Sequence, residues 1–163
     1  MSSFHITTHI SAPVERVFDL ARSIDLHLDS TEGTGEQVIA GVSSGLIGAG
    51  EEVTWRARHF GVWQTHASRI TVCDRPQHFV DVMLRGTFRS LEHHHWFDAD
   101  AEAPEERTIM RDDFAWSSPL GVLGRVADLL VLKRYLYKFL LARNRIIKTT
   151  AESEAWRKYL PEP

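Results

Sequence analysis

The chain has 163 residues, a length that predicts one compact domain over residues 1–163. An apolar share of 43% excludes a disordered or low-complexity chain, and a net charge of −3 is too small to indicate nucleic acid as the main partner. The single cysteine, Cys73, cannot form an intramolecular disulfide, which is typical of a reducing compartment.

The sequence shows no sign of export or membrane insertion. Residues 1–5 lack the basic and apolar regions of a signal peptide. The most apolar stretch, residues 129–141, is interrupted by Lys133, Arg134 and Lys138, so we expect no transmembrane segment. We therefore expect a soluble, cytoplasmic protein.

The first third of the chain predicts a strand, two short helices and a second strand. Residues 4–10 form the strand, and Ser11 is the candidate N-cap of a helix with one apolar face. A second short helix is expected to end near Asp29. The glycine-rich residues 33–50 contain a further strand at residues 36–40 and an open loop.

From residue 51 to residue 116 the hydrophobic period changes to two, which predicts an antiparallel meander. A two-residue turn at Phe60-Gly61 pairs Trp55 with His66, because residues that pair across a hairpin share one face of the sheet. Both side chains, together with His59, are expected to point inward.

A second two-residue turn, at Gly86-Thr87, is expected to pair Val80 with His93 and His78 with His95. This register places the apolar series Val80, Val82 and Leu84 on the inner face, together with His93 and His95. In the last strand, alternation of polar and apolar residues places Asp112 inside with Met110 and Phe114.

A long helix is expected to close the chain. Pro119 is an early helical proline, and apolar residues recur at helical spacing from Val122 to Ile147, with continuation past Thr149. About 30 helical residues span about 45 Å, enough to cross the whole sheet.

This order of elements resembles the START-like, helix-grip superfamily, which includes the birch-pollen-allergen-like proteins and the polyketide cyclase/dehydrase (SRPBCC) group, and within it a bacterial ligand-binding subgroup. The resemblance rests on residues 11–18 (SAPVERVF), residues 50–61, residues 86–89 with the triple histidine 93–95, residues 108–112 and residues 119–121. It implies an α+β helix-grip fold, in which a curved antiparallel sheet of six to seven strands wraps around a long C-terminal helix. Two short helices follow the first strand.

The resemblance also implies an internal apolar cavity that holds a hydrophobic or amphipathic small molecule, such as a lipid. A few polar side chains would orient the guest, since binding sites of this kind are largely apolar. The ligand-binding candidates among the inward residues are Trp55, His59, His66, His93, His95, Met110, Asp112 and Phe114.

Three alternatives remain for the inward polar residues. They form a satisfied hydrogen-bond network of the core, or one histidine moves a proton in a cyclase- or dehydratase-like reaction. His93 and His95, with His66, His78 or Asp112, are also a weak metal-binding pattern. We expect no cofactor and no bound metal, and more a binding protein than an enzyme.

Two further features leave other roles open. His27 lies in the short helical connection, where it either contacts ligand or is an exposed loop residue. The last helix is basic, with Arg125, Lys133, Arg134 and Lys138 followed by Arg143, Arg145 and Lys148. These residues either cover the solvated back of the helix or contact an anionic membrane or a partner. Nothing in the sequence decides between a monomer and a homodimer.

Overall fold

The computed structural model describes residues 1–119 and 131–161. Its strands are β1 (Ser2–Ile10), β2 (Gln37–Gly41), β3 (Glu52–His59), β4 (Val62–Asp74), β5 (His78–Arg85), β6 (Ser90–Ala99) and β7 (Thr108–Ser117). Its helices are α1 (Val14–Ala21), α2 (Ile24–Ser30), α4 (Lys133–Ala151) and two 3₁₀ turns, η1 (Glu32–Thr34) and η3 (Glu154–Lys158). The part of the expected closing helix that falls on residues 122–130, with Arg125, lies outside the described residues.

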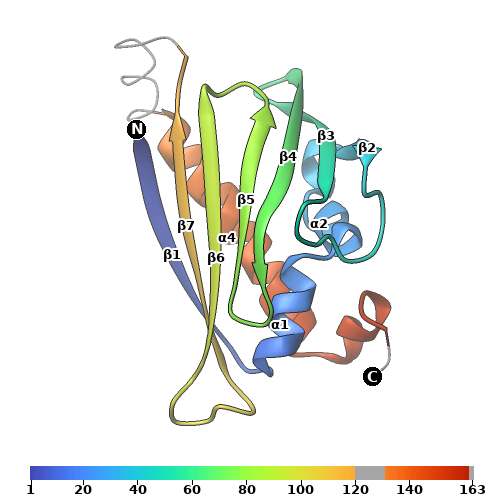
Figure 1. Ribbon diagram of the computed structural model, residues 1–163, viewed down its shortest axis with the longest axis vertical. Helices are drawn as coiled ribbons and strands as arrows, with labels where there is room; N and C mark the ends of the chain where they lie inside the picture. Colours follow the sequence, from blue (N-terminus) through green and yellow to red (C-terminus); the bar gives the residue numbers. More distant parts are fainter. Residues whose placement is uncertain (120–130, 162–163) are drawn as a thin grey trace.

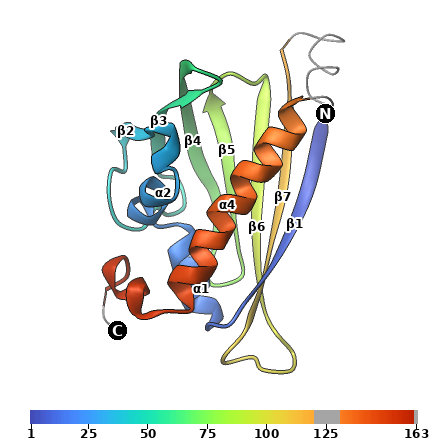
Figure 2. The same cartoon turned by 180° about the vertical axis from the view of Figure 1, so that it is seen from behind.

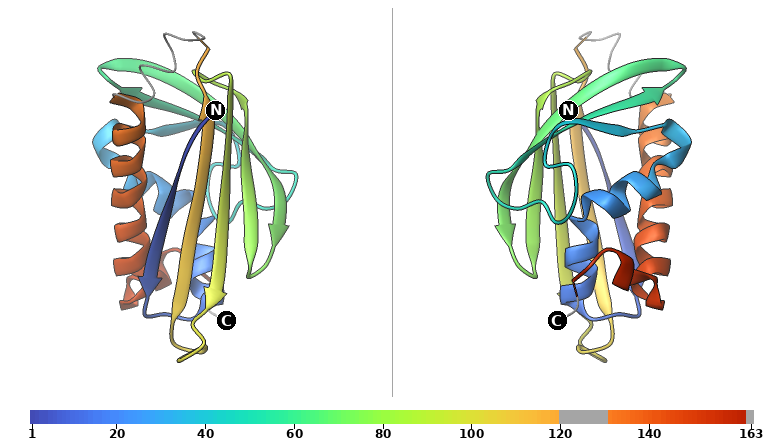
Figure 3. Two further views of the ribbon diagram at one scale, coloured as in Figure 1. Left: turned by 90° about the vertical axis from the view of Figure 1, so that its left-hand side faces the viewer. Right: turned by 90° about the vertical axis from the view of Figure 1, so that its right-hand side faces the viewer.

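The seven strands form one antiparallel sheet in the order β1-β7-β6-β5-β4-β3-β2 (Figure 1). Strands β3 to β7 follow one another as a meander, and β1 closes the far side against β7. The sheet curves, and α4 runs obliquely along one face of it (Figures 2 and 3). The predicted α+β helix-grip architecture is confirmed.

The first predicted hairpin has the expected register. His59 pairs with Val62, and Trp55 pairs with His66. Phe60 and Gly61 both have positive φ angles, 52° and 79°, as the two central residues of a type I′ turn require. A right-handed strand twist favours this turn, so the local sequence specifies which face Trp55 and His66 share.

The register predicted for the second hairpin is wrong by one residue. His93 pairs with Asp81 and His95 with Phe79, instead of with Val80 and His78. The connection between β5 and β6 is longer than two residues, because β5 ends at Arg85 and β6 begins at Ser90. A one-residue slip reverses the faces of a strand, so Phe79 and Asp81, rather than the predicted even-numbered series, lie opposite the two histidines.

The predicted N-cap of the first short helix is wrong. Helix α1 has Pro13 at its N-cap and no side-chain cap, so Ser11 does not cap it. Helix α2 is capped by Ser23, whose hydroxyl accepts a hydrogen bond from the backbone N–H of Leu26. Both helices pack against α4.

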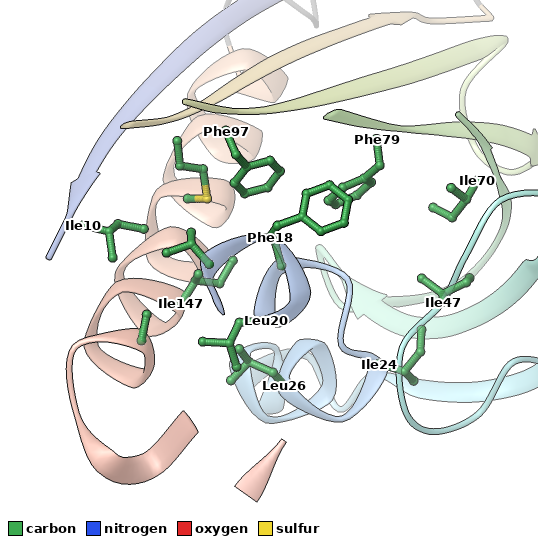
Figure 4. Packing of buried hydrophobic residues seen from close by; sticks show 14 of the residues in the cluster. Ile10, Phe18, Leu20, Ile24, Leu26, Ile47, Ile70, Phe79, Phe97 and Ile147 are labelled. Atoms are coloured by element: carbon green, nitrogen blue, oxygen red, sulfur yellow. The ribbon is translucent and has the colours of Figure 1, made fainter. Parts of the chain in front are cut away.

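The main hydrophobic core lies where α1, α2 and the end of α4 meet the sheet (Figure 4). Phe18 of α1 packs edge-on against Phe79 and Phe97, with ring centroids 5.6 and 5.2 Å apart. Ile147 of α4 closes this cluster. A second cluster, which contains Phe4, Trp116 and Leu140, fills the space between β1, β7 and the middle of α4. Within the described residues, no helix is both long enough and apolar enough to cross a bilayer.

Candidate ligand-binding site

A cavity of about 420 Å³ lies between the sheet and α4. This volume is within the range of sites that take small organic ligands, roughly 300–1,000 Å³. Strands β3 to β7 contribute inward side chains at alternate positions, among them Val53, Trp55, Phe79, Leu91 and Phe114. The wall is therefore predominantly apolar, with a small number of polar groups.

Helix α4 and its N-cap residue Leu132 supply the opposite wall through a single stripe of side chains. Leu132, Tyr135, Leu136, Phe139, Leu140 and Arg143 line the cavity, at spacings of three and one that place them on one helix face. Beyond this stripe, Ile147 belongs to the main core. Arg143 therefore stands where the cavity ends and the close-packed interior begins.

Six of the eight predicted site residues line this cavity. They are Trp55, His59, His66, His93, His95 and Phe114. Their proximity places them where a guest would lie, and their contact with a ligand remains a prediction.

Met110 and Asp112 do not line the cavity, although both side chains point inward as predicted. Each is fully buried. Met110 belongs to the main hydrophobic core, and Asp112 is enclosed by hydrogen-bonding side chains. Alternation along β7 specifies the face of a residue, but it does not specify what covers that face.

Asp112 is the centre of a buried polar network behind the cavity wall. Its Oδ1 atom lies 2.9 Å from Nε2 of His93 and 2.9 Å from Nδ1 of His95. Only the His93 contact has the geometry of a hydrogen bond, since Nδ1 of His95 has no hydrogen-bond partner. The side-chain amide of Asn144 donates to Oδ2 of Asp112 at 2.6 Å. One carboxylate thus joins β6, β7 and α4.

The network fixes the charge of two of its members. Burial would raise the pKa of Asp112, but the contacts from His93 and His95 outweigh it and hold that pKa far below its usual range. Burial, together with the neighbouring His93, lowers the pKa of His95 well below its usual value. At neutral pH, Asp112 is therefore an anion and His95 a neutral imidazole.

The same three residues are the described group whose donor atoms could share a metal ion. One ligand atom from each of His93, His95 and Asp112 lies within 4.8 Å of the others. The nitrogen atoms of His93 and His95 each lie 2.9 Å from Oδ1 of Asp112, a separation that ordinary hydrogen bonds also have. The expectation that no metal binds therefore remains a prediction.

A second polar group lies at another part of the wall. Nε2 of His27 lies 3.1 Å from Oε2 of Glu36, and the His27 ring stacks on Trp55 with centroids 4.3 Å apart. Nδ1 of His59 lies 2.7 Å from the hydroxyl of Tyr135 on α4. Both His27 and Glu36 line the cavity, so His27 is not a free loop residue.

Burial acts in opposite directions on the acid and the bases of this wall. It would raise the pKa of Glu36, but the hydrogen bond with His27 outweighs it and leaves the pKa below its usual value. Burial lowers the pKa of both His59 and His66. The carboxylate is held ionised, and the two imidazoles are held neutral.

The sequence prediction missed four charged residues of the wall: Arg22, Glu36, Asp81 and Arg143. Arg143 was grouped with the solvated basic residues of the last helix, but it is only 8% exposed. A signal was present, because Arg143 follows Leu136 and Leu140 at spacings of seven and three and precedes Ile147 by four, within the apolar stripe. Asp81 was missed because the apolar series Val80, Val82 and Leu84 was expected on the inner face of its strand, whereas Phe79 and Asp81 line the cavity.

Known proteins resemble this chain in structure but not in sequence. No family model matches the chain, and no curated protein matches it. Among solved structures, the Zhui aromatase/cyclase from Streptomyces sp. R1128 is similar with a TM-score of 0.73 at 14% identity, covering 94% of this chain and 95% of that one.

Two other structures show the same likeness. A START superfamily protein from Mycobacterium smegmatis has a TM-score of 0.67 at 10% identity, with 92% of this chain and 97% of that chain covered. Major latex-like protein 151 from Panax ginseng has a TM-score of 0.68 at 16% identity, with 93% and 98% covered. From the topology and these likenesses, the chain has the START-like (SRPBCC) helix-grip fold.

Proposed function

We propose that this protein binds a hydrophobic or amphipathic small molecule in the cavity between the sheet and α4. The observation that carries the proposal is the cavity itself, about 420 Å³ of space with a mostly apolar lining. Protein interiors are otherwise packed to the density of organic crystals, so an unfilled apolar volume of this size calls for an occupant.

Burial of the apolar area of the ligand supplies most of the affinity, at roughly 25 cal/mol per Å² before the costs of ordering are subtracted. The cavity contains large flat side chains, including Trp55, Phe79 and Phe114, which suit an aromatic or a lipid-like body. The few polar groups supply orientation and selectivity.

The experiment is a titration of the purified protein with 2-naphthol, paired with a variant that fills the cavity. Ala57 is buried on β3 and lines the cavity, and Ala57→Phe places a ring in the space that the ligand needs. Thr65→Phe is the matched control, because Thr65 is exposed on the neighbouring strand β4 and does not line the cavity.

We expect saturable binding of one molecule to the wild type, at least about tenfold weaker binding to Ala57→Phe, and unchanged binding to Thr65→Phe. Equal binding by the wild type and Ala57→Phe, or the absence of saturable binding of 2-naphthol, 2-naphthoate and 2-methylnaphthalene alike, would contradict the proposal. Native mass spectrometry of untagged protein would then identify the molecule that it carries from its host.

A second candidate function is favoured by one observation. His93 lines the cavity and is oriented by Asp112 through a 2.9 Å contact, which is the arrangement of a general base and its orienting carboxylate. In this reading the cavity folds a linear polyketone and His93 removes a proton in a cyclase- or dehydratase-like step. Turnover of a linear polyketone that disappears in His93→Gln would support this candidate. A rate equal to that in buffer would exclude it for that substrate.

A further inference from the structure

Arg143 is a buried cation in the wall of a mostly apolar cavity. It belongs to the stripe of α4 that faces the sheet, and it is 8% exposed. Four other basic residues of the helix, Lys133, Arg134, Lys138 and Arg145, are exposed, and Lys148 is half-buried. A guanidinium at this position requires partners, because an uncompensated buried charge is costly.

The described part of the protein satisfies this guanidinium only in part. Nη2 of Arg143 donates to the backbone carbonyl of Ala21 at 2.7 Å. Nη1 is buried and has no hydrogen-bond partner among the described residues. The Ala21 carbonyl is a neutral acceptor, so the N–H groups of Nη1 lack an acceptor and no described carboxylate is hydrogen-bonded to the guanidinium.

The acids around Arg143 are occupied elsewhere or also unmatched. Asp112 interacts with His93 and Asn144, and Glu36 with His27. Asp81 lines the same cavity and has a buried Oδ1 atom without a hydrogen-bond partner. Burial lowers the pKa of Arg143, and the charges of Asp112, Asp81 and Glu36 offset this effect only in part.

We propose that the ligand of this cavity carries an oxygen acceptor, a carboxylate or a hydroxyl, which Arg143 binds while the hydrocarbon body lies against the apolar wall. The inference rests on the proposed function and adds the chemical class of the ligand to it. A planar guanidinium presents its donors to oxygen, and hydrogen bonds from a charged donor are about twice as strong as neutral ones. A hydroxyl has, in addition, a proton that it can donate to Asp81.

The test uses three probes of one shape at neutral pH: 2-methylnaphthalene, 2-naphthol and 2-naphthoate. The methyl compound has no acceptor, the hydroxyl compound is neutral, and the carboxylate is an anion. For the wild type, we expect at least one oxygen-bearing probe to bind about tenfold or more tightly than 2-methylnaphthalene, as a charge-assisted hydrogen bond predicts. The order of the two oxygen-bearing probes then tells whether the acceptor is ionised or neutral.

Two variants assign the preference to Arg143. Arg143→Met removes the guanidinium and retains a flexible apolar stem of similar length, so it is expected to abolish the preference while 2-methylnaphthalene still binds. Arg145→Met makes the same change at an exposed position of the same helix and is expected to leave the preference intact. Binding of 2-methylnaphthalene and the melting temperature report whether each variant is folded.

The outcomes separate this inference from the proposed function. If all three probes bind the wild type equally, or if the preference persists in Arg143→Met, the inference is wrong and the binding function stands. If none of the three binds, the binding function is contradicted for molecules of this shape and the inference fails with it. Should Arg143→Met not fold, the wild-type series alone still decides whether an oxygen acceptor is preferred.

Discussion

The Nε2–H group of His93 on β6 donates to Oδ1 of the ionised Asp112 on β7 at 2.9 Å, and both side chains are buried. Because Asn144 of α4 binds the other oxygen of the same carboxylate, this pair links the sheet to the helix. The polar network is therefore a structural clamp, and only its two histidines reach the cavity wall.

The first prediction concerns the stability that the clamp provides. Asp112→Ala leaves the His93 imidazole and the Asn144 amide without their acceptor and removes the charge beside His95, so we expect the free energy of unfolding to fall by about 3–5 kcal/mol. Urea denaturation monitored by circular dichroism measures this loss. Asp98→Ala is the control, because Asp98 pairs with Arg111 at the surface and such pairs contribute at most about 1 kcal/mol. A loss for Asp112→Ala no larger than that of the control would show that the clamp is unimportant.

The second prediction concerns pH. Because burial holds the pKa of His95 well below its unfolded value, the unfolded chain binds more protons than the folded one as the pH drops below about 6.5. The contribution of His95 to stability is complete above that pH and is lost as the pH falls toward the folded pKa. We expect the free energy of unfolding to decrease between about pH 7.5 and pH 5.5.

The variant His95→Gln identifies the group responsible. Glutamine does not titrate, so the variant should show a smaller pH dependence than the wild type, although it is less stable overall. His9→Gln removes an exposed histidine and should retain the dependence of the wild type. If His95→Gln has the same dependence as the wild type, His95 does not cause it.

The third prediction concerns Trp55, which lies in the cavity wall beneath His27. Trp55→Leu removes aromatic area from the wall, so we expect about fivefold to tenfold weaker binding of 2-naphthol and a smaller change in tryptophan fluorescence on binding. Trp63→Leu on the same hairpin serves for comparison, since Trp63 is 49% exposed and is not part of the lining. Equal effects of the two substitutions would argue that the ligand binds elsewhere.

The fourth prediction concerns Gly41, the last residue of the edge strand β2. Gly41 has a φ angle of 83°, and a Cβ atom built on it would lie 2.1 Å from the backbone oxygen of Glu52. Gly41→Ala should therefore reduce the free energy of unfolding by more than about 2 kcal/mol. Gly45→Ala has a similar φ of 79° but open space around the new atom, so about 1 kcal/mol is expected. Thermal denaturation of both variants distinguishes the close contact from the backbone strain.

The features that were predicted correctly from the sequence are those that depend on a few neighbouring residues. The Phe60-Gly61 turn specifies a hairpin type, so the inward placement of Trp55 and His66 followed from it. His93 was placed inward correctly although the register was wrong, because the predicted inner face of β5 was also wrong by one residue and the two errors cancelled. The length of the connection between β5 and β6 has no such local signature, so the register was wrong. Asp81 was missed because the apolar series of β5 was expected on its inner face.

The depth of a residue depends on packing between distant segments, which periodicity along one strand does not contain. Asp112 lies behind the cavity wall rather than in it because His93, His95 and Asn144 surround it. Arg143 shows the converse, since its charge suggested solvent whereas its position in the apolar stripe of α4 determined its burial. For Arg143, the helix periodicity predicts burial better than the charge of the side chain does.

The central claim is that a small apolar molecule occupies the space between Trp55 and α4. A crystal structure of the protein in complex with 2-naphthoate tests it most directly. We expect the naphthalene ring between Trp55 and Leu136, with the carboxylate within hydrogen-bonding distance of Arg143. A ring bound only on the outer surface, or a cavity that is filled by the protein's own side chains at saturating ligand, would contradict the account.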